Sequence, residues 1–255
     1  MATIRSRAVE SPSIWGDRGS SGGIPRPLRS LWRRLLRLRF HLFQRHRYDN
    51  YAWEEVQGRR ILVLPQVFNP ALFAASRFLV QNLNSQWISP GCAVLDLGTG
   101  AGLAAIVASE WAGQVTAVDI NPMAVRCARI NVLVNQVEDR VQVLEGDLFG
   151  PLGDHRFDVV LFNPPFYRGE PRDALDRAWR SPDVVDRFAA VLRRHLTSNG
   201  CALVVLSSIG ASAEYLAAFQ AHGLKADVIA RRDVVSEVLA IHRLQAEPGR
   251  VAGLD

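Results

Sequence analysis

Four consecutive residues, Asn163-Pro164-Pro165-Phe166, have the composition of a rigid platform for a planar nitrogen group. Two prolines in succession end a strand, and Pro164 pushes Asn163 toward extended geometry. The side-chain oxygen of Asn163 and the carbonyl oxygen of Pro164 are then predicted to accept both N–H bonds of an amide or an aromatic amine, while Phe166 stacks on its face. We predict that all four residues are catalytic. They would orient the nitrogen and stabilise the charge that grows on it, without a nucleophilic side chain.

A glycine-rich segment supplies the second chemical signal. Residues 94–102 are Val-Leu-Asp-Leu-Gly-Thr-Gly-Ala-Gly, and glycine permits sharp turns and close approach of a ligand to the backbone. A dinucleotide-binding loop would carry a further glycine where Leu103 stands, and Asp96 is a poor neighbour for a pyrophosphate. The acid instead favours a cationic ligand. S-adenosylmethionine fits, because it carries a sulfonium and an ammonium group and no phosphate.

Acidic residues also end the next two predicted strands. Asp119 lies 19 residues after Gly100, where a carboxylate can accept from ribose hydroxyls. Asp147 stands where a carboxylate can accept from the adenine amino group. The plainer interpretations are a cap on the following helix for Asp119 and a turn for Asp147. No metal site is predicted. The predicted cofactor-binding residues are Asp96, Gly98, Thr99, Gly100, Gly102, Asp119, Ile120, Asp147, Leu148 and Asn163.

The elements that must position these residues follow from the pattern of apolar runs. Strands are predicted at 92–97, 114–119, 141–145, 157–162, 202–207, 225–230 and 237–244. Helices are predicted at 103–111, 122–135, 182–196 and 211–222. Alternating strands and helices indicate an α/β fold with a mostly parallel sheet covered on both faces. The last two strands have no helix between them, which predicts a closing hairpin with an antiparallel last strand.

Length and composition indicate one α/β domain with an extension, because 255 residues usually build one or two cores. We expect a disordered segment at 1–24, a basic amphipathic helix at 25–48 and a strand and helix subregion at 49–90. The catalytic domain is expected at 91–245 and a tail at 246–255. Within 49–90, residues 59–68 are predicted as a strand or hairpin arm, and residues 69–84 as a helix. No apolar run is long enough to span a membrane. Three scattered cysteines indicate buried free thiols in a reducing compartment, which favours the cytoplasm.

The net charge of +5 is unevenly distributed along the chain. Residues 1–48 hold eleven arginines against Glu10 and Asp17, so the basic excess lies on this N-terminal arm. Three interpretations stay open. The helix packs its apolar face on the catalytic domain, or the arm contacts RNA, the ribosome or an acidic partner. The third is a membrane-surface or organelle-targeting segment, since transit peptides are also rich in arginine and serine.

Residues 92–245 resemble a class I S-adenosylmethionine-dependent methyltransferase of the small-domain type. Residues 96–102 and the tetrapeptide 163–166 carry the resemblance. The group with this combination includes the HemK-group (release-factor glutamine) N-methyltransferases and amino-methyltransferases of adenine and guanine in RNA or DNA. The resemblance implies a Rossmann-like sheet of seven strands in the order 3-2-1-4-5-7-6, with the seventh antiparallel. It also implies that Asn163 and Pro164 hold the acceptor nitrogen.

Finer features divide the group. Residues 174–179 and 237–241 are similar to the eukaryotic and archaeal glutamine methyltransferases. Residues 180–182 depart from them where they carry glycines, residues 72–76 where they carry acids, and Phe166 where they carry tyrosine. The leading hypothesis is methylation of a glutamine side chain in a protein, such as a translation factor. The alternatives are methylation of an exocyclic amine of adenine or guanine in RNA or DNA, with phosphate contacts from the arm, and a catalytically silent binding protein.

Overall fold

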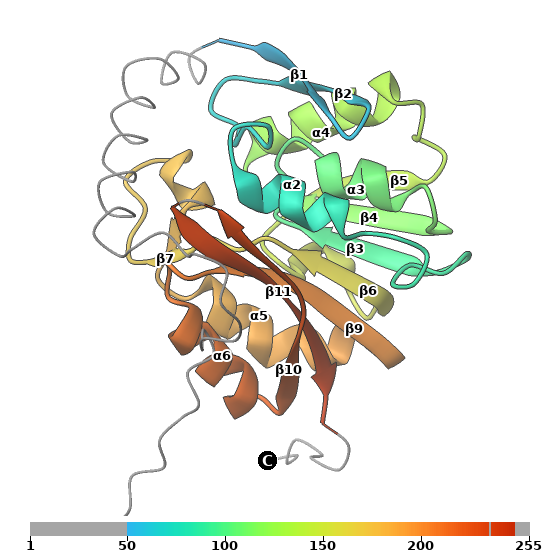
Figure 1. Cartoon of the computed structure of the whole chain (residues 1–255). Helices are drawn as coiled ribbons and strands as arrows, with labels where there is room; N and C mark the ends of the chain where they lie inside the picture. Colours follow the sequence, from blue (N-terminus) through green and yellow to red (C-terminus); the bar gives the residue numbers. More distant parts are fainter. Residues whose placement is uncertain (1–49, 235, 248–255) are drawn as a thin grey trace, which may run out of the picture.

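The computed structural model describes residues 50–234 and 236–247, and one sheet of seven strands lies at its centre (Figure 1). The strands are β3 (Ala93–Leu97), β4 (Gln114–Asp119), β5 (Val141–Glu145), β6 (Phe157–Phe162), β9 (Leu196–Ser207), β10 (Leu224–Val234) and β11 (Glu237–Ala246). They lie in the order β10-β11-β9-β6-β3-β4-β5. Neighbours from β9 to β5 are parallel, whereas β11 is antiparallel to both β9 and β10. The expected order 3-2-1-4-5-7-6 with an antiparallel last strand is therefore confirmed.

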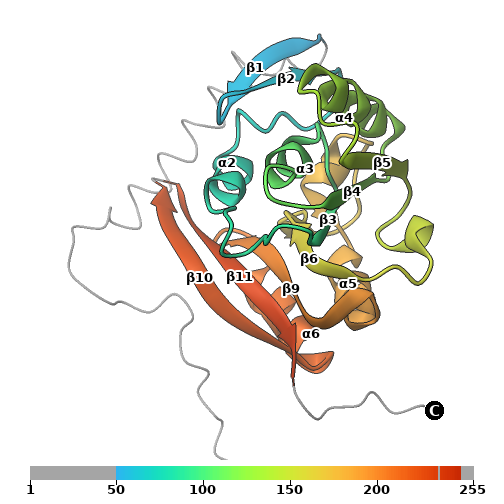
Figure 2. The ribbon, with the colours of Figure 1, turned by 90° about the vertical axis from the view of Figure 1, so that its right-hand side faces the viewer.

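Helices cover both faces of this sheet (Figure 2). One face carries α2 (Ala74–Gln81), α3 (Leu103–Ala108) and α4 (Pro122–Val134), and the other carries α5 (Val184–Leu192) and α6 (Ser212–Ala221). Successive strand residues point to opposite faces, so Val94 belongs to the core under the first group of helices and Leu95 to the core under the second. The parallel strands are thus buried on both sides, and their carboxyl ends share one open edge.

The N-terminal part of the described chain is a hairpin attached to the core. Its strands β1 (Ala52–Val56) and β2 (Arg59–Val63) are antiparallel. The sequence predicted an arm at 59–68 and no strand at 52–56. Asn131 on α4, fully buried, holds the hairpin: its Oδ1 accepts from Leu62 N at 2.7 Å, and its Nδ2 donates to Leu62 O at 2.7 Å. The same Nδ2 donates to Ala101 O at 2.8 Å, which links the hairpin to the loop after β3.

Helix α2 begins at Ala74, five residues later than the predicted start at Asn69. The residues between form a turn, because Asn69 Oδ1 accepts from Ala71 N at 2.9 Å. Asn69 Nδ2 also donates to Glu54 Oε1 at 2.9 Å, which joins this turn to β1. The side chain that was expected to open the helix is used in a crosslink to the hairpin.

Two further differences concern the second half of the chain. Strand β9 begins at Leu196 rather than at residue 202, and its polar start is paired: Thr197 Oγ1 donates to Asp158 Oδ1 at 2.9 Å. A small parallel sheet of β7 (Tyr167–Arg168) and β8 (Arg180–Ser181) was not predicted. Strands of two residues are too short to produce a periodic pattern. Between them, residues 169–179 form an excursion whose 3-10 turn, η3, spans Asp176–Ala178.

The predicted disordered segment at 1–24, the basic helix at 25–48 and residues 248–255 of the predicted tail lie outside the described residues. The interpretations of the N-terminal arm stay predictions for the same reason. Across residues 50–234 and 236–247, no helix combines the length and the apolar character that crossing a bilayer requires.

Candidate active site

The loop between β3 and α3 turns on three glycines. Gly98, Gly100 and Gly102 have φ angles of 65°, 57° and 85°, which side chains with a Cβ rarely adopt. A Cβ on Gly102 would lie 3.2 Å from the Cα and Cβ atoms of Ala128 on α4, so this glycine allows close packing of loop and helix. Among the described residues, no atom lies within 4 Å of a Cβ built on Gly100. The loop therefore leaves space for a ligand beside its backbone.

Asp96 lies under this loop and is almost fully buried. Its Oδ2 accepts from Thr99 Oγ1 at 2.7 Å and from Ala105 N at 3.1 Å, so the carboxyl group ties the loop to the first turn of α3. Burial raises the pKa of Asp96 to about 7, although both hydrogen bonds act in the opposite direction. A cation bound beside it would favour the ionised form.

Asp119 ends β4 and is connected to the same loop. Its Oδ2 accepts from Gly100 N at 2.8 Å, and its Oδ1 accepts from Asn121 N at 2.9 Å. Burial raises the pKa of Asp119 as well. The next residue, Ile120, is 39% exposed, a high value for a large apolar side chain. The structure thus brings the second predicted acid to the glycine loop, with an apolar surface beside it.

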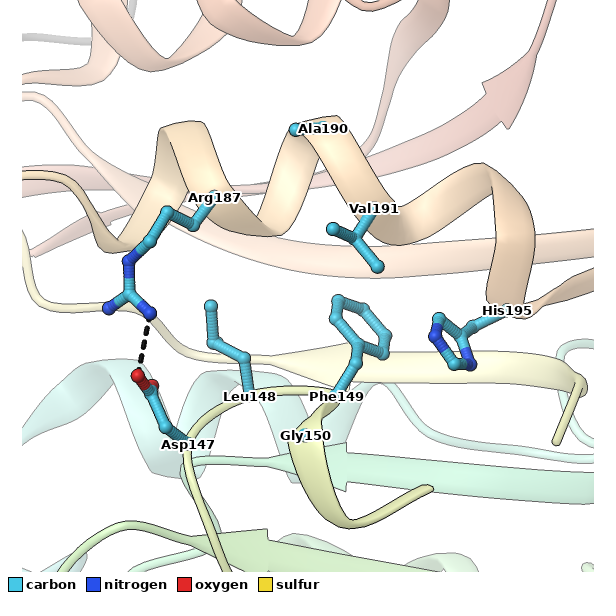
Figure 3. Close-up of a pocket in the computed structure, with 8 residues that line it drawn as sticks. All are labelled: Asp147, Leu148, Phe149, Gly150, Arg187, Ala190, Val191 and His195. Atoms are coloured by element: carbon cyan, nitrogen blue, oxygen red, sulfur yellow. Dashed lines mark hydrogen bonds and ion pairs between the residues drawn. The ribbon is translucent and has the colours of Figure 1, made fainter. Parts of the chain in front are cut away.

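Asp147 lies beyond β5 and has a different environment. It is exposed, and its Oδ2 pairs with Arg187 Nη1 on α5 at 2.6 Å (Figure 3). The two residues line one end of a cavity of about 440 Å³ between the chain after β5 and α5. Leu148, with a φ of 50°, lies in the same wall, and the far end is formed by Phe149 and His195, whose rings stack at 4.6 Å. Asp147 is therefore separate from the network of hydrogen bonds around Asp96 and Asp119.

Asn163 follows β6 at the open edge, next to the glycine loop. A Cβ on Gly98 would lie 3.9 Å from the ring of Phe162, the last residue of β6. Asn163 Nδ2 donates to Ser76 Oγ on α2 at 3.3 Å. Its Oδ1 is buried, and none of the described residues gives it a hydrogen bond. A buried acceptor left in this way is costly and points to a missing partner such as a ligand.

The rest of the tetrapeptide is fixed by α6 and the turn before it. Tyr215 Oη donates to Pro165 O at 2.9 Å, and Ala211 N donates to Phe166 O at 2.8 Å. A Cβ on Gly210 would lie 2.4 Å from Phe166 O, so this position accepts only glycine. Phe166 itself is half-buried against the core. Its predicted stacking on an acceptor group stays a prediction.

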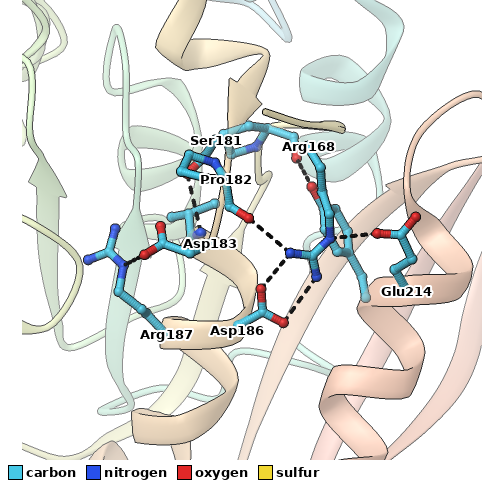
Figure 4. A network of polar contacts seen from close by, with 10 residues as sticks. Arg168, Ser181, Pro182, Asp183, Asp186, Arg187 and Glu214 are labelled. Carbon is cyan, nitrogen blue, oxygen red and sulfur yellow. Dashed lines mark hydrogen bonds and ion pairs between the residues drawn. The ribbon is translucent and has the colours of Figure 1, made fainter. Parts of the chain in front are cut away.

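A group of charged side chains anchors the chain after the tetrapeptide (Figure 4). Arg168 on β7 forms two hydrogen bonds with Asp186 on α5, at 2.6 and 3.0 Å, and pairs with Glu214 on α6 at 2.7 Å. Its guanidinium holds the pKa of Asp186 below the usual range. Arg187 joins Asp183, at 3.1 Å, to Asp147. Arg168 thereby connects the chain after the tetrapeptide to helices α5 and α6.

A second cavity, of about 430 Å³, lies between Ile120 and the excursion that joins β7 to β8. The excursion is ordered around Asp176, whose Oδ2 accepts from Arg172 N at 3.0 Å and pairs with Arg180 Nε at 3.6 Å. The cavity is lined by Ile120, Asn121, Pro122, Pro171, Arg172, Asp173, Ala174 and Arg177. Across this cavity, Ile120 of the predicted cofactor site faces the charged and partly exposed excursion.

Three residues at this edge were not identified from the sequence: Ser76, Arg168 and Arg187. Ser76 lies in a helix where only the lack of acidic residues had been noted. The two arginines are members of a chain with many arginines, and no spacing distinguishes them. Each of the three contacts a partner on another helix, strand or loop, and the spacing of residues along the sequence does not indicate such contacts.

The donor set fits S-adenosylmethionine. The open backbone at Gly100 and the carboxylates of Asp96 and Asp119 offer hydrogen-bond partners and negative charge to a cationic nucleoside. Within the described residues, no group of three His, Cys, Asp or Glu side chains is placed to bind a metal ion.

Comparison with known proteins identifies the family. Residues 59–230, more than half of the chain, match the family model of the methyltransferase small domain. A Methanocaldococcus jannaschii protein provisionally named as a protein N5-glutamine methyltransferase is 32% identical over 196 residues, which are 73% of this chain and 95% of that protein. The ribosomal protein uL3 glutamine methyltransferase of Bradyrhizobium diazoefficiens is 39% identical, over 42% of this chain and 38% of that protein.

Among solved structures, the 16S rRNA N2 G1207 methyltransferase of T. thermophilus has a similar fold, with a TM-score of 0.57 at 21% identity. The match covers 76% of this chain and 50% of that one. The order of the strands, the glycine loop with Asp96 and Asp119, and the family match all indicate the same kind of protein. The chain belongs to the methyltransferase small-domain family, and it is an S-adenosylmethionine-dependent methyltransferase.

Proposed function

We propose that this methyltransferase acts on the side-chain amide nitrogen of a glutamine in a protein of the translation machinery, a ribosomal protein or a release factor. Two relatives support a glutamine acceptor. The Methanocaldococcus jannaschii relative is named for glutamine and aligns over nearly its whole length, and the second is named for glutamine in ribosomal protein uL3. The resemblance of residues 174–179 to glutamine methyltransferases points the same way.

The structural observation that supports a planar nitrogen acceptor is the buried Oδ1 of Asn163, which receives no hydrogen bond from the residues that the structure describes. It fits an amide and an exocyclic amine alike, and the two relatives favour the amide. A primary amide has two N–H donors and a flat shape. One donor would satisfy Oδ1, and the carbonyl oxygen of Pro164 would accept the other. The substrate would thereby remove the cost of a buried unsatisfied acceptor.

The chemical difficulty of the reaction explains why such acceptors suffice. The lone pair of an amide nitrogen is delocalised into the planar group and points poorly at an incoming methyl group. Two fixed acceptors would hold the nitrogen in one orientation and stabilise the positive charge that develops on it. Tyr215 and Ala211 hold the carbonyl groups of Pro165 and Phe166, so the platform is rigid before a substrate binds.

The residues at the other strand ends would hold the cofactor, which supplies an electrophilic methyl group when bound. In this proposal Asp119 accepts from the ribose hydroxyls and Asp147 from the adenine amino group. Asp96 would supply negative charge to the cationic cofactor, and the glycine loop, residues 98–102, would hold its amino acid part. Ile120, which is 39% exposed, and Leu148, which is partly buried, would contribute apolar surface to the nucleoside.

Labelling of a cell lysate tests the acceptor class. The full chain is incubated with lysate and methyl-labelled cofactor, and the products are divided between nuclease and protease treatment. We expect label that survives nuclease, is lost to protease and, after acid-free digestion to single amino acids, is found on N5-methylglutamine. Asn163→Ala is the control for non-enzymatic labelling. Label that nuclease removes would reject the glutamine proposal in favour of an exocyclic amine of a nucleobase.

A further inference from the structure

The side chain of Asn163 can lie in the site in two orientations that differ by exchange of its oxygen and its nitrogen. Only one of them presents an acceptor to the substrate. With Oδ1 toward the open edge, an N–H group of the substrate finds an oxygen; with Nδ2 there, it meets a donor. The proposed role of Asn163 therefore requires a neighbour that binds the nitrogen end of the amide and holds it away from the open edge.

Ser76 is the neighbour that the structure provides. Its Oγ accepts from Asn163 Nδ2 at 3.3 Å, which turns the nitrogen toward α2 and leaves Oδ1 as the buried atom without a partner among the described residues. Ser76 and Asn163 are 87 residues apart in the sequence, and Ser76 belongs to a helix outside the strand and loop that carry the tetrapeptide. The hydrogen bond thus connects the segment before the core to the proposed acceptor site.

The position of Ser76 is itself well determined. Helix α2 is anchored by Phe78, Leu79 and Val80, which are buried in the core. The residue before the helix, Phe73, stacks on Phe68 with ring centroids 4.7 Å apart, and Trp179 lies 5.7 Å from Phe73. Because Trp179 O accepts from Tyr167 N, just after the tetrapeptide, the same aromatic group holds both α2 and the chain that follows Phe166.

From this geometry we propose that Ser76 is a positioning residue for methyl transfer. It holds the Asn163 side chain with Nδ2 toward α2 and Oδ1 toward the acceptor nitrogen. Ser76 touches neither substrate nor cofactor in this proposal and acts only through Asn163. The inference rests on the proposed role of Asn163 but not on the identity of the acceptor, since amides and exocyclic amines both require an oxygen at this place.

A double-mutant cycle tests the proposal. Ser76→Ala is expected to lower kcat about tenfold, the scale of one orienting hydrogen bond, while KM and the dissociation constant of S-adenosylhomocysteine change less than about twofold. Ser76→Thr keeps the hydroxyl and is expected to retain most of the rate. Arg77→Ala, an exposed change in the same helix, is the matched control and should leave kcat unaltered. Thermal unfolding with and without S-adenosylhomocysteine verifies that each variant is folded.

The decisive comparison is made in the Asn163→Ala background under single-turnover conditions. If Ser76 acts through Asn163, adding Ser76→Ala there causes no further loss. A further loss of the same size as in the wild type would overturn the proposal, as would an unchanged kcat in Ser76→Ala alone. The assays use the lysate fraction that the wild type labels. A wild type that labels only nucleic acid therefore rejects glutamine while the cycle still tests Ser76.

Discussion

The loop after β3 and the tetrapeptide after β6 lie on adjacent strands of one sheet, yet they treat their polar groups in opposite ways. The loop satisfies its own: Asp96 binds Thr99 and Ala105, and Asp119 binds Gly100. The tetrapeptide leaves Asn163 Oδ1 buried without a partner within the described chain. From these contacts we expect the loop to keep its shape with or without a ligand, and the tetrapeptide site to be complete only when a donor binds. We therefore expect changes in the loop to affect mainly cofactor binding, and changes in the tetrapeptide to affect mainly methyl transfer.

The largest expected effect separates the two regions directly. Asn163→Ala removes the proposed acceptor and is expected to lower kcat by about 10²–10³-fold, the range measured when one oriented hydrogen-bond partner of a transition state is removed. The cofactor loop does not depend on this side chain. Isothermal titration should therefore give a nearly unchanged dissociation constant for S-adenosylhomocysteine. Equal losses in binding and in turnover would contradict the division between the regions.

The converse experiment changes the loop. Asp119→Ala removes the proposed ribose contact and the hydrogen bond to Gly100 N. We expect the dissociation constant of the cofactor to rise about 10–100-fold, as for loss of a charge-assisted hydrogen bond of about 1.5–3 kcal/mol. The kcat at saturating cofactor should fall much less. Asp158→Ala, which alters a carboxylate at the opposite end of the sheet, is the control. An unchanged dissociation constant in Asp119→Ala would reject the ribose contact.

The pH dependence of cofactor binding tests the buried carboxyl of the loop. Burial raises the pKa of Asp96 to about 7, so the free protein binds a proton at this site below pH 7 and releases it above. A cationic cofactor favours the carboxylate, and binding below pH 7 must therefore expel the proton. The dissociation constant should increase as the pH falls from 7 to 5.5, by up to about tenfold per pH unit. Calorimetry in buffers of different ionisation enthalpy measures the released proton.

Asp96→Asn provides the matched variant for that titration. The amide keeps the shape of the side chain and cannot ionise in this range, so the pH dependence should disappear while binding weakens at pH 8. A titration curve that is the same in the wild type and in Asp96→Asn would assign the proton to another group.

The smallest effect on cofactor binding is expected at Asp147, because its carboxylate is exposed and exposed charges contribute little free energy to an interaction. Asp147→Ala should weaken S-adenosylhomocysteine binding only a few fold. It should also reduce the preference for S-adenosylhomocysteine over S-inosylhomocysteine, in which the amino group is replaced by oxygen. Asp183→Ala removes the other acid that pairs with Arg187 and serves as the control. If the preference persists in Asp147→Ala, this residue does not recognise adenine.

Much of the architecture was predictable because it depends on local runs of residues. The strand at Phe157–Phe162 and the helix at Pro122–Val134 agree with the prediction at both ends, or to within one residue. In each case apolar periodicity meets a strong signal at its end, the two prolines after Phe162 and the Asn121 cap before Pro122. The predicted start of the helix at Asn69 was wrong, because the Asn69 side chain bonds within a turn and to Glu54 instead of capping a helix. Helix α2 begins later, at Ala74.

The sequence alone determined the alternation of strands and helices, the position of the glycine loop and the place of Asn163 at the end of β6, because glycine, proline and apolar spacing act within a few residues. The order of the strands followed from the resemblance to the family. Only the tertiary structure decided what these groups contact. Ser76 reaches Asn163 across 87 residues, and Arg187 reaches Asp147 across 40. Such contacts depend on how helices cross the sheet, and many packings share the same local pattern. The nitrogen platform was therefore predictable as a motif, but the serine that orients it emerged only from the packing of α2.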